Sequence, residues 1–203
     1  MGHRWDYWAR TMSAGRLLDE AIPQISFSGN DRTGMKLVED WIRLVDHHHG
    51  GWAAIGKLFD WLLWGFGLSP DPALSAELNE QLYRKVNLGP LLTNPYDYFG
   101  EWIAESRGNW NPHAFFPTPH TVTEMMVRMT MDTGEDMRTK TVCDPAVGSG
   151  RMLLHASNFS LRLYGADIDP ELVKLTKING VLYAPWLARP FPDSFFAQLE
   201  AKP

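Results

Sequence analysis

A short turn and two acidic residues have the composition and spacing of a ligand-binding site. Asp144 ends a short apolar run, and Gly148 and Gly150 follow it in the segment DPAVGSG. Glycine lets a ligand approach the backbone closely, and the first turn of a helix offers free N–H groups. A carboxylate in such a turn does not suit a pyrophosphate, but it attracts a positively charged amine. The turn therefore predicts a ligand that carries an amine and no phosphate.

Asp167 is the second acid of the pattern, and it ends the segment LYGAD. It follows the glycines by about twenty residues, the interval at which an acid in nucleotide-binding folds accepts hydrogen bonds from ribose hydroxyls. Ile168 comes next, where an apolar side chain can lie beside an adenine. S-Adenosylmethionine carries an amine, a sulfonium and a ribose but no phosphate, so we expect it as the ligand. Asp169 stands before Pro170 and is expected to cap a helix.

Two strands, each followed by a helix, must position these residues. We expect strands at 141–143 and in LRLYGADI, with helices from about Arg151 and from Pro170. This order predicts parallel strands joined by a right-handed crossover, which brings the carboxyl ends of both strands to one edge. Cys143 lies in the first strand and is expected to be a small core residue.

A further helix is expected upstream of the turn, within FFPTPHTVTEMMVRMTMD. Thr118 would cap this helix and Pro119 would occupy its first turn. Its apolar residues recur at a helical interval, which predicts that one face is buried. The residues of that expected stripe are Val122, Met125, Met126 and Met129.

The chain before residue 111 is predicted to be helical and rich in tryptophan, since every Trp except Trp186 lies there. Roughly the first thirty residues are interrupted by helix breakers and are expected to form an arm. A helix from Met35, with Thr33 as its cap, and a second helix at WAAIGKLFDWLLWGF are expected to follow. The second helix is apolar nearly all round, which allows two interpretations: burial in the core, or docking of a partner.

The expected fold class is α/β, in a chain of 203 residues with a formal net charge of -5. We expect a Trp-rich helical N-terminal region at 1–110 and a partial Rossmann-like cofactor-binding region at 111–203. The acidic net charge counts against an autonomous DNA binder. No apolar run approaches the ~20 residues of a membrane span, and the N-terminus lacks a signal-peptide core. A soluble, cytoplasmic protein with no membrane partner is therefore expected.

Three consecutive histidines, His47 to His49, interrupt the helical region. Ligands for one metal ion on a helix must share a face, whereas three consecutive side chains point in three directions. We therefore expect these residues to end a helix, and we expect no metal site.

Four segments resemble N6-adenine DNA methyltransferases, above all the modification subunits of type I restriction systems and their phage and plasmid relatives. DPAVGSGRMLL resembles the DPACGSGGFLL-type loop of that family, and FFPTPHTVTEMM resembles its FFTP segment. NPYDYFGEWIAE is similar to the helix upstream of FFTP, and YGADIDPELVKLTKIN to the strand and helix that carry the ribose-binding acid. The four segments stand in the order that the family has.

The resemblance implies a DNA adenine-N6 methyltransferase with S-adenosylmethionine as its cofactor. It implies that Asp167 holds the ribose of the cofactor and that Ile168 lies beside the adenine. The residues that it assigns to the methionine end of the cofactor are Phe116, Thr118, Pro119, Asp144, Pro145, Ala146, Gly148, Ser149 and Gly150.

The sequence departs from the family at the catalytic motif. Such enzymes carry an Asn-Pro-Pro-Tyr-type tetrapeptide on a later strand, whose polar side chain holds the amino group of a flipped adenine. The tetrapeptide does not occur in this sequence, so we expect a chain truncated before that motif. The nearest segment is Asn94-Pro95-Tyr96, which precedes the cofactor residues as in circularly permuted relatives. We expect it to start a helix, and it is a weak candidate for catalysis.

Two functions remain open at this point. The first is an S-adenosylmethionine-dependent DNA adenine methyltransferase, acting on DNA directly or through a partner chain. The second is a catalytically inactive module that binds the cofactor and docks on a partner. A protein partner, or a second copy of the chain, is a candidate source of the missing catalytic elements. A nucleotide-dependent oxidoreductase is disfavoured, because the turn lacks the third glycine of that fingerprint.

Overall fold

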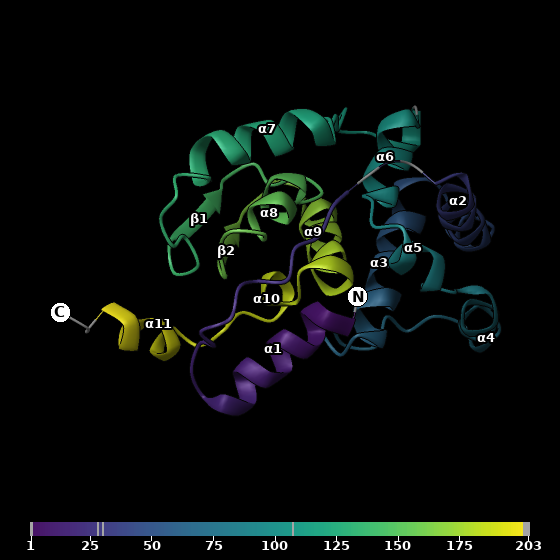
Figure 1. Ribbon diagram of the computed structural model, residues 1–203. Helices are drawn as coiled ribbons and strands as arrows, with labels where there is room; N and C mark the ends of the chain where they lie inside the picture. The colour runs from purple at the N-terminus through teal and green to yellow at the C-terminus, as the bar shows by residue number, and fades with distance from the viewer. Residues whose placement is uncertain (1, 28, 30, 107, 201–203) are drawn as a thin grey trace.

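The computed structural model describes residues 2–27, 29, 31–106 and 108–200 of the chain (Figure 1). The helices before residue 111 are α1 (Gly2–Ala14), α2 (Arg32–Asp46), α3 (Trp52–Gly65), α4 (Ala76–Lys85), α5 (Gly89–Thr93), α6 (Tyr98–Glu105) and the 3-10 helix η1 (Gly108–Trp110). The later elements are α7 (His120–Met131), β1 (Thr141–Asp144), α8 (Arg151–Ala156), β2 (Arg162–Gly165), α9 (Pro170–Tyr183), α10 (Pro185–Ala188) and α11 (Asp193–Glu200). The described residues therefore combine helices with a small parallel sheet.

The sheet consists of β1 and β2 in the part of the chain that the structure describes. The two strands are parallel, with Thr141 opposite Arg162 and Asp144 opposite Gly165. Helix α8 connects them and packs against both, and α7 packs along α8 (Figure 1). The predicted strand–helix–strand–helix order with parallel strands is thus confirmed, and it brings Asp144 and the end of β2 to the same edge.

The exposure of Cys143 contradicts the prediction that it is a core residue. Within the described residues β1 pairs with β2 alone, so its other edge has no neighbouring strand. Tyr164, which is paired with Cys143 across the ladder, is also exposed. A short apolar run predicts a buried strand only when strands or helices cover both of its faces.

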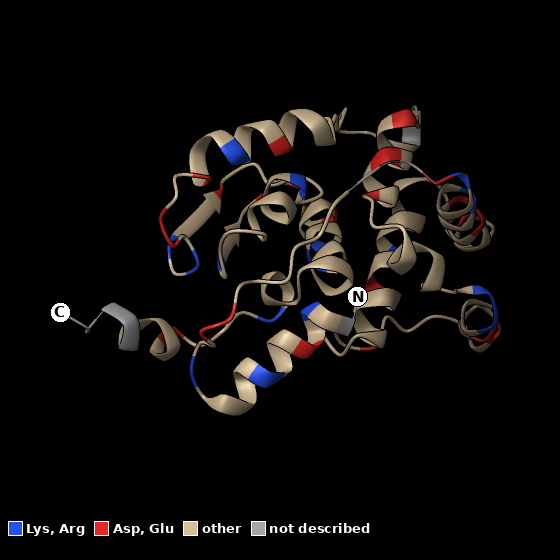
Figure 2. Cartoon of the chain, viewed as in Figure 1, with Lys and Arg blue, Asp and Glu red and all other residues tan. Residues whose placement is uncertain are grey.

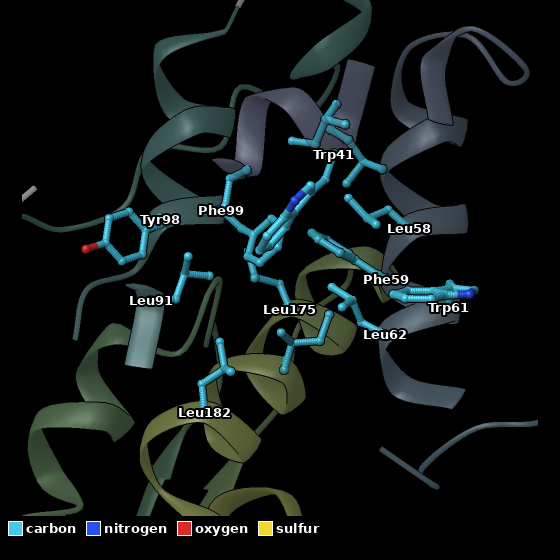
Figure 3. Packing of buried hydrophobic residues seen from close by; sticks show 14 of the residues in the cluster. Trp41, Leu58, Phe59, Trp61, Leu62, Leu91, Tyr98, Phe99, Leu175 and Leu182 are labelled. Carbon is cyan, nitrogen blue, oxygen red and sulfur yellow. The ribbon is translucent and has the colours of Figure 1, made fainter. Parts of the chain in front are cut away.

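The main hydrophobic core lies between α2, α3, α6 and α9. Figure 3 shows Trp41, Phe59 and Phe99 meeting at its centre, with Leu175 and Leu182 of α9 beneath them. The rings of Phe59 and Phe99 pack edge to face, with centroids 5.4 Å apart. Helix α3 is buried on most sides, which confirms the core interpretation of its apolar sequence and contradicts the docking interpretation.

The first residues form a regular helix rather than the expected arm. Helix α1 is held by its buried Arg4, which donates hydrogen bonds to the carbonyl oxygens of Ser157 at 2.8 Å and Tyr183 at 2.7 Å. Trp5 and Trp8 likewise donate from their indole nitrogens to backbone carbonyls near the end of the chain. The predicted regions 1–110 and 111–203 stay a prediction, and residues 1 and 201–203 at their ends lie outside the described residues.

Helix α2 begins and ends close to the predicted positions, but with a different cap. Asp31, rather than the expected Thr33, caps the helix, because its side chain accepts a hydrogen bond from the Thr33 backbone N–H at 3.2 Å. The helix ends at the three histidines, where the N–H of His47 still donates to the carbonyl of Arg43. The histidines therefore stand at the end of a helix, as predicted.

The contact between α2 and α6 leads to a first prediction. Gly34 lies against the buried Tyr98, and a Cβ atom at Gly34 would stand only 2.4 Å from a ring carbon of Tyr98. Gly34→Ala is therefore expected to lower the free energy of unfolding by about 1–3 kcal/mol, because it overpacks the interface. Urea denaturation measures this change. Gly50→Ala, where the added methyl meets open space, is the control, and an equal stability of the two variants would contradict the prediction.

Helix α7 buries a different face from the expected one. Its buried residues are His120, Thr123, Val127 and Met131. The residues of the predicted stripe, exposed by 38% to 78%, are Val122, Met125, Met126 and Met129. The helix starts at His120, so Pro119 takes the cap position expected for Thr118. The buried face mixes His120 and Thr123 with Val127 and Met131, so apolar spacing alone does not reveal it, and the packing against α8 decided which face is buried.

Among the described residues, charges of both signs are spread over the helices and loops (Figure 2). Figure 2 shows Lys and Arg interspersed with Asp and Glu along the helices and loops. Within the described residues, no helix combines the length and the apolar composition that crossing a membrane requires. The formal net charge of -5 is thus a small excess of acidic residues over interspersed basic ones.

Candidate cofactor-binding site

A cavity of about 280 Å3 lies at the carboxyl ends of β1 and β2, under the segment 115–118 that precedes α7. Its wall combines the glycine turn after β1, the acid after β2 and the aromatic segment. The residues assigned to the cofactor that line this cavity are Phe116, Thr118, Asp144, Ala146, Gly148, Ser149 and Asp167. The structure thus brings together side chains that the sequence places far apart.

The other residues assigned to the cofactor lie near this cavity without lining it. Pro145 and Gly150 belong to the same turn, and Pro119 borders a neighbouring cavity. Ile168 is fully exposed directly after Asp167. The roles of these four residues toward a ligand stay predictions.

The glycines of the turn are required by its backbone. Gly148 and Gly150 have φ angles of +54° and +88°, in the left-handed region that glycine adopts readily. A Cβ atom at Gly148 would also stand 2.9 Å from the ring of Phe115. The turn is fastened to Ala166, directly after β2, by hydrogen bonds from Ala166 N to Asp144 O and from Val147 N to Ala166 O. The backbone of the turn is therefore held in one conformation where it borders the cavity, and no side chain at Gly148 covers it.

Asp167 holds the turn and keeps capacity for a ligand. Its two carboxylate oxygens accept hydrogen bonds from the backbone N–H groups of Gly148 at 2.8 Å and Asp169 at 3.0 Å. A carboxylate offers about four lone-pair sites. Two acceptor sites therefore remain for two donors, such as the hydroxyls of a ribose.

Asp144 is the second carboxylate on the cavity wall. One of its oxygens accepts a hydrogen bond from the backbone N–H of Ala146 at 3.1 Å. The Asp144 and Asp167 carboxylates face a cavity whose lining includes one basic residue, Arg151. That guanidinium is itself paired with Asp97 and Glu101, so the wall attracts cationic groups and disfavours phosphates.

Asp169 caps helix α9, as the sequence predicts. One of its carboxylate oxygens accepts a hydrogen bond from Glu171 N at 2.9 Å. The other lies 2.5 Å from Nδ1 of His113, in the loop before the aromatic segment. Asp169 therefore ties the start of α9 to the segment that covers the cavity.

Sequence reasoning missed the ionic cluster beneath the turn. Arg151 is buried at the start of α8 and donates hydrogen bonds to Asp97 at 2.8 Å and Glu101 at 2.6 Å. Burial lowers the pKa of the Arg151 guanidinium, but the Asp97 and Glu101 carboxylates outweigh burial and raise that pKa above its usual value. The sequence signal for this cluster was Arg151, directly after Gly150. A charged residue that is buried at the start of a helix needs an acidic partner from another part of the chain.

A second cavity of about 650 Å3 adjoins the first across Phe116, Pro117 and Arg151, which line both. Tyr96 lies on its wall, and the Tyr96 hydroxyl donates a hydrogen bond to Glu101 at 3.0 Å. Burial, followed by the charge of Glu101, raises the pKa of Tyr96 to about 12. The phenol therefore stays neutral over the physiological range.

The candidates Asn94 and Pro95 do not line either of these cavities. Asn94 is exposed at the end of α5, and its carbonyl accepts a hydrogen bond from the Tyr98 hydroxyl at 2.7 Å. Helix α6 starts at Tyr98 and is capped by Asp97, whose side chain accepts a hydrogen bond from Gly100 N, so Asp97 rather than Asn94 marks the start of the helix. A catalytic role for Asn94, Pro95 and Tyr96 stays a prediction.

Two buried histidines lie behind the second cavity. Nδ1 of His120 and Nε2 of His155 are 3.0 Å apart, and the ring of Phe27 stacks on His120. Burial, with a smaller contribution from the charge of Arg151, lowers the pKa of each imidazole to about 4. Both histidines are therefore neutral at pH 7.

The comparisons with known proteins found a match to one family model. The family model described as N-6 DNA Methylase matches residues 90–184. This range runs from α5 to the end of α9 and includes α6, the aromatic segment, the glycine turn and both strands. The comparisons with curated proteins and with solved structures found no match.

Proposed function

We propose that the chain is a member of the N-6 DNA methylase family, whose model matches residues 90–184, and that it binds S-adenosylmethionine for methyl transfer to N6 of adenine in DNA. The cofactor would occupy the cavity of about 280 Å3 at the carboxyl ends of β1 and β2. Parallel α/β units bind nucleotide ligands in that place. The observation that carries the proposal is that Asp144, Gly148 and Asp167 line one cavity.

The residues of the wall match the chemical groups of the cofactor one by one. Asp144 has a carboxylate oxygen for the α-amino group, and Asp167 has two acceptor sites for the ribose hydroxyls. The exposed Ile168 would cover one face of the adenine. Phe116 is 84% exposed and would lose that exposure against the methionine part of the cofactor. Burying such apolar surface contributes about 25 cal/mol per Å2 to binding.

The methyl transfer needs little covalent chemistry from the chain. Bound S-adenosylmethionine supplies an electrophilic methyl group on its sulfonium. Asp144 and Asp167 would hold the cofactor so that this methyl group is available to N6 of an adenine. The chain would contribute by orienting the reactants and excluding water, which accelerates such a reaction strongly.

An Asn-Pro-Pro-Tyr-type tetrapeptide, which would hold the acceptor adenine, does not occur in residues 1–203. Tyr96 borders the second cavity, next to the proposed cofactor site, and is the residue of this chain that we propose to face the base. A partner chain or a second copy would supply the remaining contacts. DNA would be bound by this chain directly or through that partner. A partner is included because the surface has mixed charge and the net charge of -5 does not favour DNA. We further propose a cytoplasmic protein of a restriction–modification, phage or plasmid system.

A second candidate function is a catalytically inactive module that binds the cofactor and docks on a partner. The observation in its favour is the outer face of α7, where Val122, Met125, Met126 and Met129 are exposed. Exposed apolar patches on soluble proteins are common at interaction sites. The module and the enzyme share the cofactor cavity and differ in whether the methyl group reaches DNA.

The experiment that separates the two functions is methyl transfer from tritium-labelled S-adenosylmethionine to unmethylated genomic DNA. The purified chain and its Asp144→Ala variant are compared, after calorimetry has established whether each binds the cofactor. Tritium in DNA with the wild-type chain, and none with the variant, would establish the methyltransferase. Cofactor binding without transfer would favour the docking module. A wild-type chain that does not bind the cofactor would overturn both candidates.

A further inference from the structure

Asp97 is a fully buried carboxylate that joins three segments of the cavity region. It caps α6, and it accepts hydrogen bonds from the Ser149 hydroxyl at 2.5 Å, from Arg151 Nε at 2.8 Å and from Asn179 Nδ2 at 2.9 Å. Ser149 belongs to the glycine turn, Arg151 begins α8 and Asn179 lies in α9. The Asp97 side chain thus connects the start of α6 to the glycine turn.

Arg151 extends this connection to the other wall of the cavity. Its Nη1 donates a hydrogen bond at 3.3 Å to the carbonyl oxygen of Thr118, in the segment before α7. Its Nη2 pairs with Glu101, one helical turn after Asp97. Asn179 in turn donates to the backbone carbonyl of Ser149 at 2.9 Å. The cluster therefore links the glycine turn, on one wall of the cavity, to the segment 115–118 on the opposite wall.

An ionic cluster at such a buried position requires an explanation other than stability. Charges lose their hydration on burial, and a buried ion pair is often no more stabilising than apolar residues of the same size. Directional hydrogen bonds do, however, define distances and angles that apolar packing leaves free. The distances defined by Asp97 and Arg151 are those between the two walls of the proposed cofactor site.

We propose that Asp97 is a positioning residue for the cofactor, acting through Ser149 and Arg151. It sets the separation between the glycine turn and the segment 115–118, and it touches no ligand itself. The proposal rests on the proposed function, because the cavity is taken to hold S-adenosylmethionine. Without the Asp97 charge, Arg151 loses its buried partner and the turn loses the acceptor of the Ser149 hydroxyl.

The test compares three variants of the full chain. Asp97→Asn removes the central charge, and Glu101→Gln removes the outer partner of Arg151, which is partly exposed and therefore safer for folding. Asp60→Asn is the matched control, since it breaks the ion pair with Lys174 between α3 and α9 at 2.8 Å, away from the cavity. Calorimetry measures the Kd for S-adenosylmethionine well below the Tm of each variant. Amide hydrogen exchange of 115–118 and 144–150 is measured without ligand.

Asp97→Asn is expected to raise the Kd at least about ten-fold, because small displacements of positioning groups have large effects on a bound ligand. Glu101→Gln should raise it by less, and both variants should exchange faster in the two segments. Asp60→Asn should change neither quantity. If Asp97→Asn does not fold, Glu101→Gln alone decides the matter.

The possible results separate this inference from the proposed function. A lowered Tm with an unchanged Kd and unchanged exchange would make Asp97 merely structural and overturn the inference. A wild-type chain that does not bind S-adenosylmethionine would remove the proposed function. Faster exchange of the two segments in Asp97→Asn would even then support the role of Asp97 in holding them, and unchanged exchange would refute it.

Discussion

Asp167→Ala is expected to abolish measurable binding of S-adenosylmethionine, with a Kd raised at least about a hundred-fold. Two hydrogen bonds to a charged acceptor contribute roughly 1.5–3 kcal/mol each, and about 1.4 kcal/mol corresponds to ten-fold in affinity. The substitution also removes the acceptor of the Gly148 N–H, so the turn loses one of its attachments to β2. Both effects act on the same cavity and in the same direction.

The measurement is a calorimetric titration with S-adenosylmethionine, together with a thermal melt that checks the fold. Asp167→Asn should show an intermediate loss, because an amide oxygen still accepts hydrogen bonds but carries no charge. Asp132→Ala is the control, as that carboxylate is 62% exposed at the end of α7. An affinity of Asp167→Ala equal to that of the wild type would refute the assignment of the ribose to this acid.

The free energy of unfolding is expected to fall steeply between pH 6.5 and pH 4 because of His120 and His155. Burial lowers the pKa of each to about 4 in the folded chain, whereas the unfolded chain has values near 6.5. Between these values the unfolded state binds more protons than the folded state, so stability rises with pH. The stabilisation is complete above about pH 6.5 and is lost as the pH falls toward 4.

The size of this effect is roughly 3–6 kcal/mol for the two histidines together, since one pKa unit corresponds to 1.36 kcal/mol and the two protonations are coupled. Urea denaturation at a series of pH values measures it. In the double variant His120→Leu and His155→Leu the slope above pH 5 should disappear, because both partners of the hydrogen bond are removed together. His48→Gln, at the exposed end of α2, is the control. A slope that persists in the double variant would assign the pH dependence to other groups.

Features with a local cause were predictable from the sequence. The left-handed glycines Gly148 and Gly150, the cap at Asp169 and the all-round apolar helix α3 each depend on a few neighbouring residues. The order of strands and helices follows from the same local signals, and with it the meeting of Asp144 and Asp167 at one edge. The resemblance in four segments agrees with the family match at 90–184.

Features that depend on a distant partner required the tertiary structure. The sequence does not show which face of α7 packs on α8, and Val122 and Met129 proved to be exposed. Cys143 is exposed for a similar reason, since the described residues place no further strand beside β1.

The ionic cluster under the turn shows the physical reason most clearly. Asp97 and Arg151 are 54 positions apart, and each has an ordinary local role at the start of a helix. Hydrogen bonds and hydrophobic contacts depend on distance in space, whereas residue types and spacing describe only neighbours along the chain. The sequence by itself therefore determined the turn, its acids and the elements beside them, and the tertiary packing decided which buried charges hold that turn in place.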